Sequence, residues 1–427
     1  MHKNKKKSPL PVFIAIALAI LCGSFTNPQS SLCGVNIYNL YDLLGTLFIK
    51  ALMLIVVPLV ASAIITGIAK IGQEGGFGRL GLRTFLFYVS TSLSAILIGL
   101  ILVNIFKPGI SEKITFEIKK AQALNPINVE QHLSHINIKD IILSIVPSNV
   151  LEAFSNGQML SLIFFSLLFG YALSKIDKKL SQQLLDLWQA IFNTMITITH
   201  IIMKVLPLGV FCLVAKVFST TGLESLVPLI WFVISVISGL CTFTFVGLPL
   251  FLKFVAKVDP FLHFKAMAPA LITAFSTSSS SATLPITMEC VEKRAGVSNR
   301  ICSLVVPLGT TINMSGSALY ECVAAMFVAQ AYGLELSFVL QFLVVFLALL
   351  TSMGVAGVPS GSLVSIIVIL KAIGLPAEGI GLFIAVDRIL DMCRTTVNVF
   401  SDSCCAVLVA KAEGEKDVLT NKHMTEI

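Results

Sequence analysis

Apolar runs of membrane-spanning length recur along the whole chain, separated by short polar stretches. Three of them are PVFIAIALAILC from Pro11, ALMLIVVPLVASAIITGIA from Ala51 and SLSAILIGLILVNIF from Ser92. Because about 20 apolar residues cross a bilayer as a helix, this pattern predicts an all-α, multi-pass membrane protein. Composition agrees, since 56% of the residues are hydrophobic, 12% are charged and the mean hydropathy is +0.91. These values exclude an ordinary soluble domain.

Basic residues gather in alternate connections between the apolar runs. Lysine and arginine favour cytoplasmic loops, so we attribute the net charge of +7 to membrane orientation and expect no nucleic acid partner. The start MHKNKKK could belong to a secretory signal, but Ile20-Leu21-Cys22 lacks a small-residue cleavage pattern, which favours a first transmembrane helix. We expect both termini to be cytoplasmic, in a plasma membrane or a bacterial inner membrane. The tail after Glu413 is interpreted as solvated.

Two segments do not fit simple alternation. MAPALITAFSTSSSSATLPITMEC, between Lys265 and Lys293, has basic residues at both ends and six Ser/Thr residues in a row from Ser276. The segment from Ser337 to Glu378 contains SMGVAGVPSGS, whose glycines and proline interrupt a helix. We expect eight transmembrane helices plus two opposed re-entrant hairpins. Irregular backbone at membrane depth is tolerated only inside protein or beside a polar cavity, and such hairpins often mark a transporter's binding site.

The last span, roughly Leu382 to Ala412, carries polar residues on one face. In DRILDMCRTTVNVFSD, a helical repeat of about 100° per residue places the polar side chains within an arc of about 100°. Charges inside a membrane normally face protein or water and carry function. The alternative is a purely structural ladder of buried ion pairs. The residues of this arc are Asp387, Asp391, Arg394, Thr395, Asn398 and Asp402.

The penultimate span contains PLGTTINMSGSALYECV from Pro307. Gly309 and Gly316 favour local unwinding there, and unwound carbonyls can coordinate a hard cation such as sodium. Glu321 follows as a buried carboxyl and is a candidate proton carrier.

These motifs carry a resemblance to a known family. SSSSATLP, PLGTTINMSGSALYE, GVAGVP and DRILDMCRTTVNVFSD, with PLGVF at Pro207 and FYVSTS at Phe87, resemble the dicarboxylate/amino acid:cation symporters over about Asn39 to Ala412. The resemblance implies a homotrimer in which a transport domain slides as an elevator along a fixed scaffold. It divides the chain into scaffold (1–75 and 159–222), a third span of the transport domain (76–110), an external insertion (111–158), the remaining transport domain (223–412) and a cytoplasmic tail (413–427). The hairpins would span 261–295 and 338–375.

The resemblance also implies a substrate site. Asp391 would hold the substrate α-amine, Arg394 the side-chain carboxylate, and Thr395 with Asn398 the α-carboxylate. Further contacts would come from the hairpin tips and the penultimate span, at Ser280, Ser317, Val358 and Ser362.

Cations would be co-transported. The resemblance implies one sodium site at Asp402 with carbonyls of Gly309, Asn313 and Asn398. A second would use the carbonyls of Thr311, Ser352, Met353 and Val355, and a third Tyr88, Thr91, Ser92, Asn313 and residue 315.

Substrate class follows from the paired charges. Arg394 alone would suit a C4-dicarboxylate and Asp391 alone a neutral amino acid, so both together favour glutamate or aspartate, coupled to sodium and, through Glu321, to protons. The preferred acidic amino acid, the number of sodium ions, potassium counter-transport and an anion conductance stay open.

Two positions depart from the family pattern. Ser315 stands where an aspartate is usual, which predicts a weak or absent third sodium site. Neither Ser278 nor Met392 is the arginine that the family carries at one of these two positions, and whether Arg388 compensates is left open.

Other functions are less well supported. The GxGxxG at Gly76 follows a membrane span instead of a strand, and no GK dipeptide supports a Walker A motif. The ten cysteines show no CxxC spacing for zinc. A serine hydrolase would need a nearby base, and His200 and His263 have no evident serine partner, so we expect no enzyme. A channel on the same scaffold is the remaining alternative.

Overall fold

The computed structural model describes residues 10–27, 29–32, 35–73, 79–110, 143, 145–156, 158–221, 226–353 and 361–420. Within them the protein is helical except for one short antiparallel pair, β1 (Ser31–Leu32) with β2 (Val35–Asn36). The N-terminal half contains α1 (Leu10–Phe25), α2 (Ile37–Gln73), α3 (Arg79–Phe106), α7 (Val150–Ser155), α8 (Met159–Leu173), α9 (Lys178–Ile202) and α10 (Leu206–Thr221).

The C-terminal half begins with α11 (Leu226–Thr242). This helix continues through the π-helical turn η2 (Phe243–Gly247), the short α-helix α12 (Leu248–Leu250) and the π-helical turn η3 (Phe251–Ala256). There follow α13 (Pro260–Thr277), α14 (Ser280–Glu289), η4 (Cys290–Arg294), α15 (Asn299–Ile312), α16 (Ser315–Ala331), α17 (Phe338–Ser352), α18 (Ser362–Ala372), η5 (Ala377–Leu382) and α19 (Ile384–Ala412). The expected last span therefore exists and starts two residues later than predicted.

Several helices are long and apolar enough to cross a membrane. Among the described residues there are four: Ile37–Ala69, Leu80–Phe106, Val227–Ala256 and Asn299–Ala331. The pair α9 and α10, bent by 59°, makes a fifth if it counts as one span. The prediction of an all-helical chain with several membrane-spanning helices is confirmed.

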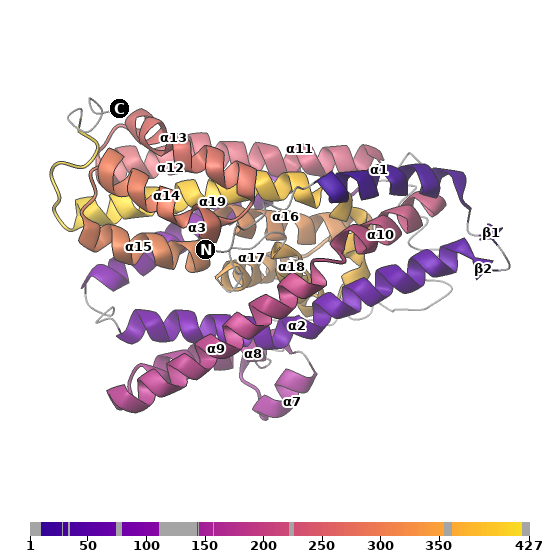
Figure 1. Ribbon diagram of the computed structural model, residues 1–427, viewed down its shortest axis with the longest axis horizontal. Helices are drawn as coiled ribbons and strands as arrows, with labels where there is room; N and C mark the ends of the chain where they lie inside the picture. The colour runs from indigo at the N-terminus through magenta and orange to yellow at the C-terminus, as the bar shows by residue number, and fades with distance from the viewer. Residues whose placement is uncertain are drawn as a thin grey trace, which may run out of the picture.

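The helices form two sets that pack mainly within themselves. The first set comprises α1, α2, α8, α9 and α10; the second comprises α3 and α11 to α19. Although α3 follows α2 directly in the sequence, it packs on α16, α11 and α19. Figure 1 shows α2, α8, α9 and α10 running together along one side of the molecule, with α19 and α16 among the helices of the other set.

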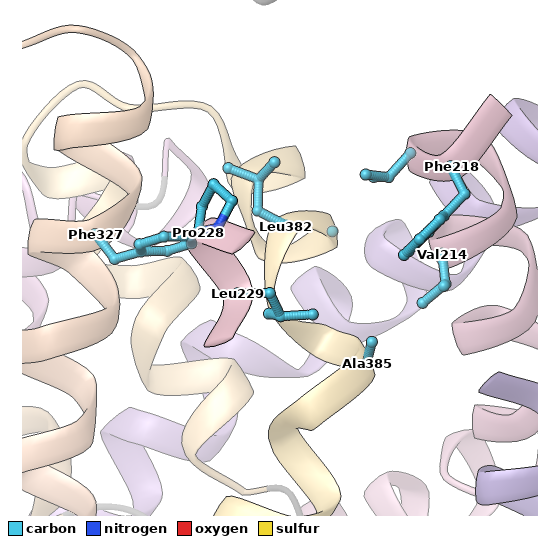
Figure 2. A pocket seen from close by; sticks show the side chains of 9 residues that line it. Val214, Phe218, Pro228, Leu229, Phe327, Leu382 and Ala385 are labelled. Carbon is cyan, nitrogen blue, oxygen red and sulfur yellow. The ribbon is translucent and has the colours of Figure 1, made fainter. Parts of the chain in front are cut away.

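A crevice lined by carbon side chains lies where the two sets meet. In Figure 2, Val214 and Phe218 of α10 face Leu229 of α11 and Leu382 and Ala385 at the start of the last span. The aromatic ring of Phe327 and the ring of Pro228 also line it.

Helix α13 and helix α14 pack on each other across a tight turn. Ser278 ends α13 in the left-handed region, at φ 49°, and the Ser279 side chain then caps α14 by accepting from the amide of Ala282 at 3.2 Å. A serine at an N-cap satisfies an amide that has no partner inside the helix. The expected break in the serine run is thus confirmed, while re-entry from one side of a membrane stays a prediction.

The break in the penultimate span falls at Asn313 and Met314, between α15 and α16. The expectation of local unwinding in this stretch is therefore confirmed, although Gly309 and Gly316, the glycines thought to favour it, are themselves helical. Their role is close approach: a Cβ on Gly309 would lie 2.6 Å from Asp402 Oδ1, and one on Gly316 would lie 2.9 Å from the Arg394 carbonyl oxygen. The missing side chains let α15 and α16 touch α19.

The expectation of a solvated tail agrees with Gly414, Lys416 and Asp417, which are exposed, and is wrong for Val418 and Leu419. Val418 and Leu419 are buried, and the Leu419 amide donates to the Ala295 carbonyl at 2.8 Å. The Glu415 carboxylate also accepts from the Ser298 amide at 3.1 Å. Two apolar side chains in the charged segment are enough to hold it against the turn after η4.

Candidate functional site

The polar face of α19 is buried inside the second helix set. All six residues of the predicted arc, Asp387, Asp391, Arg394, Thr395, Asn398 and Asp402, are buried. Helices α13, α15 and α16 pack on this helix. The polar arc predicted from helical periodicity is therefore an interior, protein-facing surface.

Arg394 is the centre of a charged cluster. Its Nη1 donates to Asp387 Oδ1 at 3.1 Å and its Nη2 donates to Asp391 Oδ1 at 2.8 Å. The guanidinium carbon lies 3.8 Å from the centroid of the Tyr320 ring, a cation–π distance. The Tyr320 hydroxyl in turn donates to Asp387 Oδ1 at 3.0 Å. In this arrangement Asp387 and Asp391 accept from the two guanidinium nitrogens, and a substrate carboxylate would need the same donors.

Two members of the cluster were not assigned a role from the sequence. Asp387 lies two helical turns before Arg394, and this spacing of seven residues places both on one face without specifying the bond between them. Tyr320 sits inside the motif SGSALYE, where no pattern distinguishes it from a core aromatic. The two ion pairs of Arg394 also agree in part with the alternative of a purely structural ladder, because they form without any substrate.

Asp391 also has a second basic neighbour. Arg388 Nη1 lies 3.5 Å from Asp391 Oδ2. Arg388 therefore reaches the polar arc and contacts the residue expected to hold the substrate amine.

Asn398 joins α19 to the start of α16. Its Oδ1 accepts from the backbone amides of Gly316 at 2.8 Å and Ser317 at 3.2 Å, and its Nδ2 donates to Ser317 Oγ at 3.0 Å. The Asn398 side chain therefore caps α16, whose first amides have no partner inside the helix. Thr395 is buried one turn earlier on the same face.

Asp402 faces the helix break. Asn313 Nδ2 donates to Asp402 Oδ1 at 2.9 Å, and the Asn313 amide donates to the Gly309 carbonyl at 2.9 Å. The side chains of Asn313 and Asp402 are completely or almost completely buried. The structure thus brings together Gly309, Asn313 and Asp402, and these groups supply the oxygen donors that a hard cation prefers.

The residues expected for a third cation site form a network of hydroxyl groups. Ser315 Oγ lies 3.0 Å from Asn313 Oδ1, 3.1 Å from Ser92 Oγ and 3.1 Å from Ser401 Oγ. Thr91 Oγ1 also donates to Asn313 Oδ1 at 3.1 Å. This cluster is neutral and its members already bond to one another, so it lacks the negative charge that would favour a cation.

Two further residues, Tyr88 and Ser401, lie near this network. The hydroxyl of Tyr88 donates to the carbonyl of Val305. Ser401, which the sequence interpretation missed, accepts from Asn313 Nδ2 at 3.1 Å and adds a hydroxyl to the cluster. Its position three residues after Asn398 on the buried face could have indicated it.

Residues of the remaining predicted sites lie beside helix breaks. Ser280 and Ser362 are the first residues of α14 and α18, and both are buried. Thr311 is the penultimate residue of α15, two residues before the break at Asn313, and Ser352 is the last residue of α17. Met353 is the last described residue after α17, while Val355 and Val358 lie outside the described residues.

Glu321 is fully buried on α16. Its Oε2 accepts from Thr351 Oγ1 of α17 at 2.8 Å, and Ser362 and Ser365 of α18 also interact with its carboxyl group. The carboxyl therefore lies where α16 meets the two helices of the second expected hairpin.

The expectation that His263 has no serine partner was wrong. His263 has a serine partner, because its Nε2 lies 2.9 Å from Ser403 Oγ. The Ser403 hydroxyl also lies 2.7 Å from the Phe400 carbonyl oxygen. This pair is buried beside the Phe400 ring, whose centroid lies 5.3 Å from that of the imidazole.

Sequence comparison assigns the chain to a protein family. The model of the sodium:dicarboxylate symporter family matches residues 10–412. The chain belongs to this family. The segment that matches the sodium:dicarboxylate symporter family includes all of α19, and therefore its polar face.

Relatives of known activity cover nearly the whole chain. It is 36% identical over 410 residues to the proton/glutamate-aspartate symporter of Escherichia coli K12, covering 95% of this chain and 93% of that protein. It is 35% identical over 406 residues to the proton/sodium-glutamate symport protein of Bacillus caldotenax, covering 95% and 94%. It is 33% identical over 455 aligned positions to mouse excitatory amino acid transporter 3, covering 94% and 84%.

Proposed function

We propose that this protein is a secondary active symporter that imports glutamate or aspartate together with sodium and protons. The observation that carries the proposal is the pairing of Asp391 and Arg394, buried side by side on one face of α19. An acidic amino acid has both an ammonium group and a second carboxylate, and this pair offers a partner to each. The activities named for the bacterial and mouse relatives agree with this substrate class.

Substrate binding requires Arg394 to exchange partners. The incoming side-chain carboxylate would take guanidinium donors now directed at Asp387 and Asp391, and the substrate amine would compensate Asp391. The α-carboxylate would meet Thr395 and Asn398, with Ser317, Ser280, Val358 and Ser362 closing the site. Tyr320 holds the guanidinium plane in place during the exchange through its ring contact.

Sodium ions would bind at two sites. Asp402 with the carbonyls of Gly309, Asn313 and Asn398 forms the first, and the carbonyls of Thr311, Ser352, Met353 and Val355 form the second. The neutral hydroxyl network around Ser315 supports no third sodium ion. Glu321 would carry the proton, since it is a fully buried carboxyl group beside the helices that flank the substrate site.

The arrangement of the helices supports an elevator mechanism. We assign eight spans to α1, α2, α3, α8, the bent pair α9 and α10, α11 to η3, α15 with α16, and α19, with α13/α14 and α17/α18 as the two hairpins. The first helix set would be the scaffold and the second the moving transport domain. Three copies would assemble through the scaffold, with both termini in the cytoplasm of a plasma membrane or bacterial inner membrane.

Uptake by proteoliposomes tests the proposal. Labelled aspartate should accumulate inside the vesicles only when an inward sodium gradient is imposed. Unlabelled glutamate should compete strongly, and serine should compete weakly. A channel on the same scaffold would equilibrate aspartate without concentrating it, and an enzyme would convert it, so either result would refute symport.

A further inference from the structure

Two consecutive residues of α13 contact one turn of α19. His263 Nε2 lies 2.9 Å from Ser403 Oγ, and the Phe264 ring stacks on the Phe400 ring with the centroids 4.2 Å apart. The Ser403 hydroxyl oxygen also lies 2.7 Å from the Phe400 carbonyl oxygen. The first arm of the expected hairpin 261–295 is thus attached to the last span by one polar and one aromatic contact.

The same turn of α19 carries proposed ligands of the first sodium site on its other side. Asn398 and Asp402 lie about one helical turn apart. The Asn398 side chain accepts from the Gly316 amide at 2.8 Å, and Asp402 accepts from Asn313 Nδ2 at 2.9 Å. The turn is therefore held on one side by the residues around the break between α15 and α16, and on the other side by α13.

Packing alone does not account for a histidine at position 263. The side chain is completely buried, and its other ring nitrogen, Nδ1, has no hydrogen-bond partner among the residues that the structure describes. A buried polar atom without a partner destabilises a fold, and a phenylalanine would fill a similar volume beside Phe400 without that cost. What the imidazole adds is the contact of Nε2 with Ser403, which a phenylalanine cannot make.

We propose that His263 is a positioning residue for the sodium site at Asp402. The inference rests on the proposed function, in which the Asp402 carboxylate and the Asn398 carbonyl hold a sodium ion. A hard cation requires its oxygen ligands at a defined distance from one another, and these two ligands belong to the turn that His263 contacts through Ser403. By this contact the imidazole fixes the position of the turn relative to α13, and the first hairpin arm and the sodium ligands keep a constant arrangement.

The sodium dependence of aspartate uptake in proteoliposomes tests this role. His263→Phe keeps a ring beside Phe400 but removes the contact with Ser403, and Ser403→Ala removes the same contact from the other side. In each variant the sodium concentration for half-maximal uptake should rise about threefold to tenfold, the range expected for one hydrogen bond. The double variant should show no further rise, because both substitutions remove one interaction. The apparent affinity for aspartate at saturating sodium should stay unchanged.

Two amide side chains at position 263 distinguish the two ring nitrogens. The glutamine amide reaches about as far from the backbone as Nε2, and the asparagine amide about as far as Nδ1. His263→Gln should therefore keep most of the sodium affinity, and His263→Asn should lose it as His263→Phe does. The matched control is His200→Phe, the same exchange at an exposed histidine on α9, which should leave the sodium dependence unchanged.

Unchanged sodium dependence in both His263→Phe and Ser403→Ala overturns the inference. Effects that add in the double variant would do the same, as would an equal loss of aspartate affinity at saturating sodium. Equal losses in His263→Gln and His263→Asn would show that Nε2 is not the group that matters. If His263→Phe does not insert, Ser403→Ala and His263→Asn give the decision. An unmodified protein whose aspartate uptake does not depend on sodium would instead contradict the proposed function itself.

Discussion

Asn313 Nδ2 donates to Asp402 Oδ1 at 2.9 Å, and this bond joins the break between α15 and α16 to the buried face of α19. The same asparagine accepts from Thr91 and Ser315 through its Oδ1. One side chain therefore links the proposed sodium site at Asp402 to the neutral hydroxyl network. Changes on either side of Asn313 are expected to alter cation binding, and the first two predictions follow from this.

Gly309→Ala should weaken sodium binding. The added Cβ would lie 2.6 Å from Asp402 Oδ1, closer than real Cβ contacts allow, so the carboxylate must move away from the carbonyl that it faces. We expect the sodium concentration for half-maximal aspartate uptake to rise by about tenfold, equivalent to about 1.4 kcal/mol. Gly381→Ala is the matched control, because its Cβ would have no atom within 4 Å. Equal sodium dependence in both variants would count against a cation site at Asp402.

Ser315→Asp should increase the number of sodium ions moved with each substrate molecule. The new carboxylate would be fully buried among Ser92, Asn313 and Ser401, where a bound cation would compensate its charge. Reversal potentials of aspartate transport, measured against imposed sodium gradients, give the stoichiometry. The same number of sodium ions in variant and unmodified protein would show that Ser315 is not the reason for a missing third site. Ser303→Asp, on the preceding helix α15 and exposed, controls for added charge.

Glu321→Gln should remove most of the pH dependence of uptake. Glutamine resembles the protonated carboxyl group, keeps the contact with Thr351 and has no proton to release. Uptake by the unmodified protein should alkalinise the compartment that substrate leaves and acidify the one it enters, and a pH-sensitive dye inside proteoliposomes measures this directly. The exposed Glu289→Gln is the control. Proton movement that persists at the same ratio to substrate in Glu321→Gln would exclude this carboxyl as the carrier.

Tyr320 should act mainly through its ring. Tyr320→Phe removes only the hydroxyl that donates to Asp387, so the apparent affinity for aspartate should change by no more than about threefold. Tyr320→Leu also removes the cation–π contact with Arg394, which contributes about 1 to 2 kcal/mol when desolvated, and should weaken apparent affinity by roughly tenfold. Competition uptake assays give both values. Equal effects of the two substitutions would mean that the ring does not hold the guanidinium.

The sequence predicted those parts of the site that follow from helical periodicity and from charge. Helical periodicity placed six polar residues on one face of α19, and all six are buried together. It could not show that Asp387 bonds to Arg394, because helical spacing gives a face without giving side-chain rotamers. It also predicted local unwinding in the stretch that contains Gly309 and Gly316, but it could not place the break at Asn313 and Met314. Glycine serves both unwinding and close packing, and only the position of the neighbouring helix distinguishes the two. His263 and Ser403 are 140 residues apart, and no local pattern could pair them.

The apolar crevice between α10 and the start of the last span has a consequence for motion. The residues that line it, such as Val214, Phe218, Leu229 and Leu382 (Figure 2), present carbon side chains to it. Dispersion contacts have no preferred direction, unlike hydrogen bonds, so one such surface can shift along another without first breaking a specific bond. At this crevice the proposed scaffold and the proposed transport domain would therefore face each other through apolar side chains, whereas the charged cluster around Arg394 lies inside the second set.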